Sequence, residues 1–518
     1  MKKQFAVASG HKHTTETAIK ILENGGNAYD AIVGALWTAT VVEPSLSSLG
    51  GGGFCLVKPK DGSAELFDFF VQTPGKRTKD IQPDFYPVEV DFGGAIQEFH
   101  IGRASVATPG TVAGLFTIWK KYGRLPMKEI VRPAVDLARN GFEVEGFQAF
   151  TFELLKPIFE ATTESRRIFS RDKENLVGAG DILKNPDLAK TMEFLAESGE
   201  EEFYRGEIAK KIVEAVTAGG YLQKSDLQDY QINIGKPLQV RYGDGIFLTN
   251  PLPSAGGTLI ALTLKLLDEI DWNDIVYKSA DYIAILTEAM RQTQIARREK
   301  LDDNLYAKNF TESFLAEEYL QELRAEIRGL NRFGSTTHIS VRDDEGNMAS
   351  LTASNGEGSG IIVPGTGIIL NNMLGEEDLN PDGFHRWPIN KRLSSMMAPS
   401  IFENEKVALV LGSAGSNRIR SAILQTIIRV VNYKLDLETA VNDSRLHFEN
   451  GKLDLEEGFS KEEVKKIKTS NLVDTVNLWK EKSLFFGGAN CLFYNKEKQN
   501  LTAVGDIRRD GKGVVRNF

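Results

Sequence analysis

The stretch that most constrains the fold is a pair of alternating runs about two-thirds of the way along the chain. Thr336 to Val341 and Met348 to Ala353 have the composition of strands, and a short loop containing a glycine, residues 343–347, joins them. The pattern predicts a β-hairpin. Because side chains alternate along a strand, two faces are expected. One carries Thr336, His338 and Ser340, and the other carries Thr337, Ile339 and Val341.

The first residue of this hairpin, Thr336, has a hydroxyl group that can serve as a nucleophile. A threonine hydroxyl is a poor nucleophile at neutral pH and needs a nearby base. If the chain is cut before Thr336, the new α-amine, with an ordinary pKa of about 7.7 to 8, becomes a base on the same residue, as in hydrolases with an N-terminal threonine. The alternative is that Thr336, Thr337 and His338 are ordinary strand residues, since threonine is common in strands.

Composition limits the class of protein. The 518 residues are 41% hydrophobic, enough for a large core, and the length alone suggests two or more domains. A net charge of −9 gives no indication of a nucleic-acid or anionic-membrane partner. No apolar run is long enough to span a membrane or to serve as a secretory signal, so a cytoplasmic protein is expected.

The cysteines and histidines indicate neither a disulfide nor a metal. Cys55 and Cys491 both lie among apolar neighbours, which predicts buried thiols. His11 and His13 are the only close histidine pair, and they lack cysteines or carboxylates at ligand spacing. We therefore predict no metal site and no cofactor.

The N-terminal region predicts two helices followed by a glycine run. The first covers about Thr14 to Glu23, and the second, Asn27 to about Val42, is apolar nearly all round and therefore buried. Gly50 to Gly53 then precede a strand. Phosphate-binding loops run from a strand through glycines to a helix, so this reversed order favours tight backbone packing near a site.

A charged helix pair is predicted between about Ser279 and Arg328. Its charges are expected on a solvated face. They include Arg291, Arg297, Arg298, Glu299 and Lys300.

Eight segments occur in an order that is specific when they are taken together. They are ENGGNAYDA (23–31), VVEPSLSSLGGGGF (41–54), SVATPGTVAGL (105–115), GGYLQKSDLQDY (219–230), LPSAGG (252–257), STTHISV (335–341), KRLSSMMAP (391–399) and GSAGSNRI (412–419). In this order they resemble the γ-glutamyltranspeptidase family of N-terminal-nucleophile hydrolases, over essentially the whole chain.

The resemblance implies an α+β fold, a four-layer αββα sandwich forming a single catalytic domain over residues 1–518. It also implies a precursor that cleaves itself between Ser335 and Thr336. The large fragment, residues 1–335, and the small fragment, residues 336–518, would remain associated.

The resemblance also assigns catalytic roles. Thr336 would be the nucleophile, with its freed amine as the base. Ser354 would stand where the family has a hydroxyl hydrogen-bonded to the nucleophile. Gly415 and Ser416 match the loop whose backbone N–H groups form an oxyanion hole.

Substrate contacts follow the same resemblance, with two departures. Asn355 and Glu376 are the residues expected to hold the α-amino group of the substrate, although the acids after Asn371-Asn372 are spaced differently from those of the family. Ser394 and Ser395 match a serine pair that binds the α-carboxylate together with an arginine. In the family that arginine follows an Arg-Glu-x-Ala-Pro segment, which residues 69–74 replace here. Arg77 is the nearest candidate, and Arg103 is the next.

The leading prediction is a self-processing hydrolase or transferase. It would cleave γ-glutamyl amides such as glutathione through a γ-glutamyl-threonyl ester, with water or an amino acid or peptide as acceptor. The segment from Asn372 to Ser394 is too short for the long lid loop of some members, which favours hydrolysis over transfer. Two alternatives stay open: an amidase or acylase with the same threonine chemistry on another amide, and a non-catalytic binding relative.

Overall fold

The computed structural model describes residues 4–77, 81–91, 96–172, 174–323, 336–380 and 383–517. Its contacts divide the chain into two compact units. The hairpin unit comprises residues 11–236 and 334–393, and the loop unit comprises residues 1–10, 237–333 and 394–518. Both units therefore contain residues from each side of Thr336. The prediction of a single domain cut into two fragments stays a prediction.

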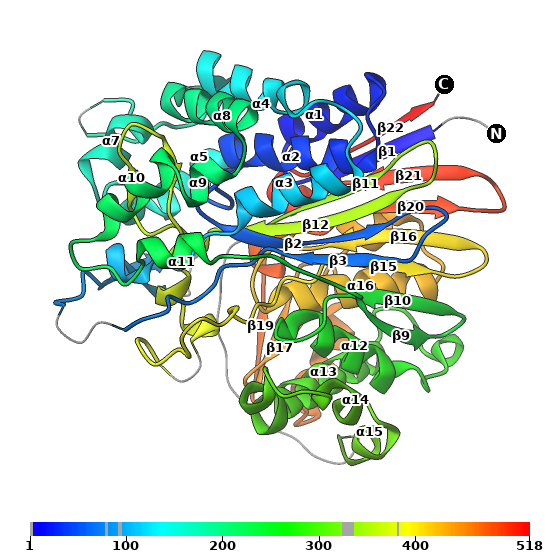
Figure 1. Cartoon of the computed structure of the whole chain (residues 1–518). Helices are drawn as coiled ribbons and strands as arrows, with labels where there is room; N and C mark the ends of the chain where they lie inside the picture. The colour runs from blue at the N-terminus through cyan, green and yellow to red at the C-terminus, as the bar shows by residue number, and fades with distance from the viewer. Residues whose placement is uncertain are drawn as a thin grey trace. The chain divides into compact units, whose positions relative to one another are not determined.

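Five strands of the hairpin unit pair antiparallel in the sheet at its centre (Figure 1). Their order is β11 (Thr337–Arg342), β12 (Met348–Ser354), β2 (Gly52–Lys58), β3 (Glu65–Asp68) and β8 (Asn233–Gly235). Thr337 lies opposite Ala353 and Arg342 lies opposite Met348. The predicted hairpin is thereby confirmed, with each strand one residue from its expected bounds.

Helices α2 (Ala28–Val42) and α3 (Thr111–Tyr122) lie along one face of this sheet, and α1 (Lys12–Glu23) packs against α2 (Figure 1). Every residue of α2 is buried, which confirms the prediction of a buried second helix. Asn27 caps its N-terminus in a capping box with Asp30. The N-terminal part of the chain thus supplies the apolar layer on which the hairpin rests.

The rest of the hairpin unit consists of short strands and helices around this core. They are β4 (Tyr86–Asp91), β5 (Ile96–Ile101), α4 (Met127–Asn140), β6 (Phe142–Glu143), α5 (Gly146–Leu154), α6 (Lys156–Phe159), α7 (Thr163–Phe169), β7 (Ile182–Leu183), α8 (Pro186–Ser198), α9 (Glu201–Tyr204), α10 (Glu207–Val216), α11 (Lys224–Gln228), β13 (Ile362–Val363) and β14 (Ile368–Ile369).

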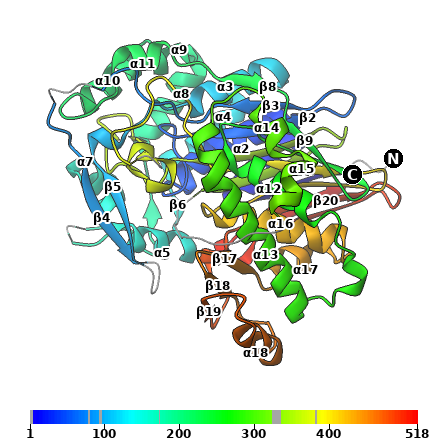
Figure 2. The same ribbon diagram turned by 90° about the horizontal axis from the view of Figure 1, so that it is seen from below.

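A six-stranded antiparallel sheet forms the centre of the loop unit. Its order is β21 (Asn500–Val504), β20 (Asn490–Asn495), β16 (Val407–Gly412), β15 (Ser400–Glu403), β10 (Gly245–Thr249) and β9 (Leu238–Tyr242). In the same unit, β1 (Gln4–Ser9) pairs antiparallel with β22 (Lys512–Asn517). Figure 2 shows a smaller sheet of β17 (Leu446–Glu449), β18 (Lys452–Leu455) and β19 (Thr475–Leu478) beside α18 (Lys461–Thr469).

The helices of the loop unit pack among themselves and against its sheets. They are α12 (Ala255–Leu267), α13 (Ala280–Ala296), α14 (Phe310–Phe314), α15 (Glu317–Leu323), α16 (Arg418–Val431) and α17 (Leu437–Asn442), together with α18. None of the helices in the described ranges is long and apolar enough to cross a membrane. The two units are both mixtures of helices and mainly antiparallel sheets, as the α+β prediction requires.

One prediction about α13 is wrong. Arg291 was expected on a solvated face, but its side chain is buried. The guanidinium lies 4.6 Å from the centre of the Phe448 ring and donates a hydrogen bond to the Leu472 carbonyl. An arginine can be buried in this way because its planar group stacks on an aromatic ring while N–H groups still donate to acceptors such as the Leu472 carbonyl.

The prediction for the two cysteines is confirmed. Cys55 and Cys491 are both buried and neither forms a disulfide. Burial raises the pKa of both thiols well above the ordinary value, which keeps them protonated.

Candidate active site

Thr336 lies directly before β11 and is 4% exposed. The register pairs Thr337 with Ala353, so the next position along each strand places Thr336 opposite Ser354. Residues directly opposite each other share a face, with Cβ atoms about 4.5 to 5.5 Å apart. The hairpin therefore brings together the two hydroxyl residues that were predicted to work as a pair. Ser335 lies outside the described residues.

The other face of β11 is fixed by a buried carboxylate. Glu43, directly after α2, is 1% exposed. It accepts hydrogen bonds from the Thr337 hydroxyl at 2.9 Å and from the Thr14 hydroxyl at 3.2 Å. The residue that follows the candidate nucleophile is thereby tied to the helical layer. Sequence reasoning missed this role, although Glu43 lies within one of the segments that carry the resemblance.

His338 has a structural role. Its Nδ1 lies 2.8 Å from the Thr352 hydroxyl and its Nε2 lies 3.0 Å from the Ser340 hydroxyl. Burial lowers the pKa of His338 to about 3, so the ring is neutral at ordinary pH. A ring held between two hydroxyls of the same hairpin orders the strands and leaves the α-amine of Thr336 as the candidate base.

The glycine run packs against the end of β12, as predicted. A Cβ on Gly51 would lie 2.5 Å from the Ser354 carbonyl oxygen, closer than real side chains approach. Gly51 also accepts hydrogen bonds from the backbone N–H groups of Gly110 and Thr111. Only glycine allows the backbone to come so near the candidate site.

The chain turns sharply after Ser354 and meets the segment that follows β14. The backbone N–H of Gly356 donates to the Ser354 hydroxyl at 3.0 Å. The N–H of Glu357 donates to the Asn372 side-chain oxygen at 3.0 Å. A Cβ on Gly356 would lie 2.2 Å from Glu376 Oε1, which places this carboxylate beside the turn. Three predicted residues, Ser354, Asn355 and Glu376, thus come together.

This corner of the hairpin unit holds two buried acids, Glu376 at 8% exposure and Glu357 at 1%. Glu376 Oε1 is buried without a hydrogen-bond partner among the described residues, and so is Asn355 Oδ1. Burial raises the pKa of Glu376 well above the ordinary value, and the charges of Glu357 and Asp378 raise it further. Such oxygens form a site that lacks a cationic hydrogen-bond donor. Sequence reasoning missed Glu357, which lies in a segment shorter than the usual family form.

The candidate arginines are engaged elsewhere. Arg77 is exposed, donates to the His385 carbonyl at 2.8 Å and stacks on Trp387. Arg103 forms a 2.7 Å ion pair with Asp84. Arg392, which sequence reasoning did not single out, is buried and forms a 3.3 Å ion pair with Asp68. The assignment of the carboxylate-binding arginine to Arg77 stays a prediction.

The predicted serine pair lies in the loop unit. The Ser395 hydroxyl accepts from the Met397 N–H at 3.0 Å, and its carbonyl accepts from the Gly256 N–H at 2.9 Å and from the Ser254 hydroxyl at 3.0 Å. Ser394 is half-buried. The LPSAGG segment therefore supports the backbone of the serine pair, which explains why the two segments occur together.

The predicted oxyanion loop connects β16 to α16. Its backbone is unusual, because Gly415 has φ +111° and Ser416 has φ +49°. A positive φ at a residue other than glycine costs free energy and persists where surrounding contacts enforce it. On the side preceding Gly415, Ala414 and Gly488 exchange two backbone hydrogen bonds of 3.2 Å.

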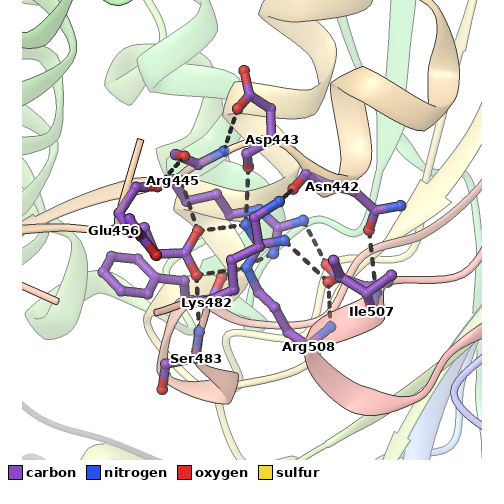
Figure 3. Close-up of polar contacts among 12 residues, drawn as sticks. Asn442, Asp443, Arg445, Glu456, Lys482, Ser483, Ile507 and Arg508 are labelled. Atoms are coloured by element: carbon purple, nitrogen blue, oxygen red, sulfur yellow. Dashed lines mark hydrogen bonds and ion pairs between the residues drawn. The ribbon is translucent and has the colours of Figure 1, made fainter. Parts of the chain in front are cut away.

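A buried ion-pair network contacts the residues just before Gly488; Figure 3 labels its members Arg445, Glu456 and Arg508. Arg445 pairs with Asp506 at 2.6 Å and donates to the Phe486 carbonyl at 3.0 Å. Arg508 pairs with Asp506 at 3.1 Å and with Glu456. Glu456 also accepts from the backbone N–H groups of Arg445, at 2.9 Å, and Ser483, at 3.0 Å. The network fixes residues 486–488, against which the predicted oxyanion loop is held.

Comparisons with known proteins agree with this geometry. The family model described as γ-glutamyltranspeptidase matches residues 14–515. The glutathione hydrolase proenzyme of Escherichia coli (strain K12) is 31% identical over 89% of this chain and 84% of its own length. The acylase ACY 1 proenzyme of Pseudomonas sp. (strain V22) is 28% identical over 98% of this chain and 93% of its own length.

The crystal structure of a cephalosporin acylase from Bacillus halodurans has a similar fold. The TM-score is 0.84 at 22% identity, with 99% of this chain and 96% of that chain covered. The α+β fold is thereby confirmed. Since the family model covers almost the whole sequence, the chain belongs to the γ-glutamyltranspeptidase family and is an enzyme of that family.

Proposed function

We propose that this protein is a self-processing threonine hydrolase that cleaves amides of donors carrying a free amino group, with γ-glutamyl amides such as glutathione as the leading class. The observation that carries the proposal is the buried Glu376 Oε1, which has no hydrogen-bond partner among the described residues. It lies beside the turn that follows Ser354, and Ser354 is the residue opposite the candidate nucleophile. A protonated amine supplies the positive charge and the N–H donors that this corner lacks.

Processing needs no other reactant than water. The Thr336 hydroxyl attacks the carbonyl carbon of Ser335 and the C–N bond breaks, so that the amide becomes an ester. Water then hydrolyses the ester, leaving a carboxylate on Ser335 and a free α-amine on Thr336. The names of both curated relatives describe proenzymes, which supports this step.

The hydrogen-bond pattern supports association of the fragments after cleavage. β12 lies in the small fragment and β2 in the large one, and they pair from Met348–Lys58 to Ser354–Gly52. In the loop unit, β15 of the small fragment likewise pairs with β10 of the large one. Cutting the bond before Thr336 leaves these ladders unchanged.

Turnover would follow the same chemistry on the substrate. The α-amine of Thr336 accepts the proton of the hydroxyl, which attacks the amide carbonyl of the donor and expels the amine product. Water, or an acceptor amine, then attacks the acyl-threonine ester. Backbone N–H groups of the Gly415–Ser416 loop would stabilise the oxyanion, a contribution of about 3 to 4 kcal/mol for such a donor.

A second candidate function, an acylase that acts on another amide, is favoured by the residues at the position expected to bind the α-carboxylate of the donor. Phe70, within the segment that replaces the arginine motif, is buried and stacks on Phe54 at 5.4 Å. Arg392 is paired with Asp68, and Arg77 is turned to His385. Recognition of a donor carboxylate would then rest on Ser394 and Ser395. We therefore expect a stronger requirement for the amino group of the donor than for its carboxylate.

Three p-nitroanilides separate these alternatives. The γ-glutamyl anilide has both the α-amino and the α-carboxylate group, the 4-aminobutyryl anilide lacks the carboxylate, and the glutaryl anilide lacks the amine. We expect kcat/KM to fall roughly 100-fold on loss of the amine, since charged hydrogen bonds contribute about 1.5 to 3 kcal/mol. Loss of the carboxylate is expected to cost less. The reverse order would contradict the proposal.

Two variants locate the amine contact. Glu376→Gln is expected to lower kcat/KM for the γ-glutamyl anilide and to leave the glutaryl anilide unchanged. Glu377→Gln, at the exposed neighbouring position, is the matched control and should leave both unchanged. Intact-mass analysis of wild type and Thr336→Ala tests processing separately, because only the wild type should yield fragments meeting at Ser335 and Thr336.

A further inference from the structure

Asn417, the residue that follows the predicted oxyanion loop, is clamped by its side chain. Its Oδ1 accepts from Arg297 Nη1 at 3.2 Å, and its Nδ2 donates to Glu449 Oε1 at 2.9 Å. Both partners come from distant parts of the sequence, Arg297 from the end of α13 and Glu449 from β17. The clamp therefore ties the exit of the loop to two separate elements of the loop unit.

Glu449 is itself held by a chain of polar contacts. Its Oε2 lies 3.1 Å from His447 Nε2, and His447 Nδ1 lies 2.5 Å from the Ser421 hydroxyl on α16. The three side chains are at most 5% exposed. The distances are those of a serine–histidine–acid triad, but a buried serine within a helix has no access to a substrate. These contacts instead join β17 to the first turns of α16, where the loop ends.

The charge of Glu449 belongs to this arrangement. Burial acts to raise the pKa of the carboxyl, but the hydrogen bond and charge of His447, with Arg420 and Arg418, hold it below the ordinary value overall. Burial lowers the pKa of His447. Glu449 is therefore a charged acceptor facing the Asn417 amide, and charge-assisted hydrogen bonds are shorter and stronger than neutral ones.

The loop needs such support because its backbone is strained. Ser416 has φ +49°, directly before the clamped Asn417. From this geometry we infer that Glu449 is a positioning residue, which holds the Gly415–Ser416 loop in the conformation that aims its N–H groups at the oxyanion. The inference rests on the proposed function, since it assigns the support for the loop used there.

The test compares two isosteric variants of buried carboxylates in one small sheet. Glu449→Gln removes the charge that faces Asn417. Asp454→Asn is the matched control, because Asp454 is buried on β18 opposite His447 and accepts from Asn477 at 2.7 Å and Trp479 at 2.9 Å. Amide hydrogen exchange of the peptide covering residues 412–420 is measured for both, together with kcat and KM for the γ-glutamyl anilide.

We expect Glu449→Gln to speed exchange in this peptide and to lower kcat by about 10- to 100-fold with little change in KM, since small misplacements of a catalytic group have effects of this size. Asp454→Asn should do neither. Unchanged exchange in Glu449→Gln would overturn the inference, and so would faster exchange with an unchanged kcat. If wild type turns over no anilide, the proposed function fails, while the exchange result still decides whether Glu449 holds the loop.

Discussion

Buried carboxylates in the two units differ in the hydrogen bonds that the protein donates to them. In the loop unit, Asp506 and Glu456 accept hydrogen bonds from buried arginines and from backbone N–H groups. In the hairpin unit, Glu376 is also buried, yet its Oε1 has no partner in the described chain. The difference teaches how a structural acid is distinguished from a binding acid: the first is saturated by the protein, and the second leaves an acceptor for a ligand.

The largest effect on stability is expected from a substitution in the loop unit, where the buried carboxylates accept hydrogen bonds from the protein. Glu456→Gln removes one charge from a network in which Arg508 is buried, and of the two counter-ions Glu456 and Asp506 it leaves the guanidinium with Asp506 alone. Loss of one partner of a buried ion pair costs about 3 to 5 kcal/mol. We expect the free energy of unfolding, measured by urea denaturation in the uncleaved Thr336→Ala chain, to fall by about that amount.

The control for this prediction is a more exposed pair. Glu403 pairs with Lys496 at 2.7 Å, with side chains 25% and 31% exposed. Glu403→Gln should change the stability far less, because exposed ion pairs are screened by solvent. Equal effects from the two substitutions would mean that the network in Figure 3 is not a stabilising element.

A smaller effect is expected at the helical support of the hairpin. Thr337→Val and Thr14→Val each remove one hydrogen bond to Glu43, with donor distances of 2.9 and 3.2 Å. Each is expected to lower the free energy of unfolding by about 1 to 3 kcal/mol, because a buried charged acceptor loses a donor. Only Thr337→Val should also slow self-cleavage, because Thr337 follows the nucleophile directly.

Intact-mass analysis against time measures that rate for both variants. Thr14→Val serves as the comparison for a loss of stability without a change in the hairpin. If both variants cleave at the wild-type rate, Glu43 stabilises the fold but does not place Thr336.

The hairpin and the buried helix were predictable because both depend on local periodicity. The alternation from Thr336 to Val341 and the apolar composition of 28–42 determine strand and helix without knowledge of distant partners. The role of Ser354 was predicted from the resemblance, and the register of the hairpin in the structure places it opposite the candidate nucleophile. The α+β class followed from the resemblance, which rests on motif order.

The contacts that were missed are the long-range ones. Thr337 meets Glu43 across 294 positions, and Arg508 meets Glu456 across 52. Neither pairing has a periodic signal in the sequence. Arg291 was misjudged for the same reason, since the ring of Phe448 and the carbonyl of Leu472 that allow its burial lie far along the chain. A charged residue on a helix indicates solvent only until its partners are known.

The smallest expected effect, a dependence of stability on pH, distinguishes the two kinds of acid directly. The raised pKa of Glu376 means that the folded state retains a proton that the unfolded state releases, so its contribution to stability falls as pH rises from the ordinary value of 4.5. For Asp506 burial acts to raise the pKa, but Arg445 and Arg508 lower it overall. Its contribution is present above the ordinary value of 3.8 and is lost as pH falls.

Thermal unfolding midpoints of the Thr336→Ala chain, measured across the acid range, are the test. The parent chain is expected to lose stability with rising pH because of Glu376, and adding Glu376→Gln should remove this loss. The unfolding midpoint of the variant should therefore rise relative to that of its parent as pH increases. The parent chain is expected to gain stability from Asp506 with rising pH, and adding Asp506→Asn should remove this gain. The unfolding midpoint of this variant should therefore fall relative to that of its parent as pH increases. Difference curves of the same slope would show that Glu376 is satisfied within the protein like Asp506, and the case for a cationic ligand at that corner would be lost.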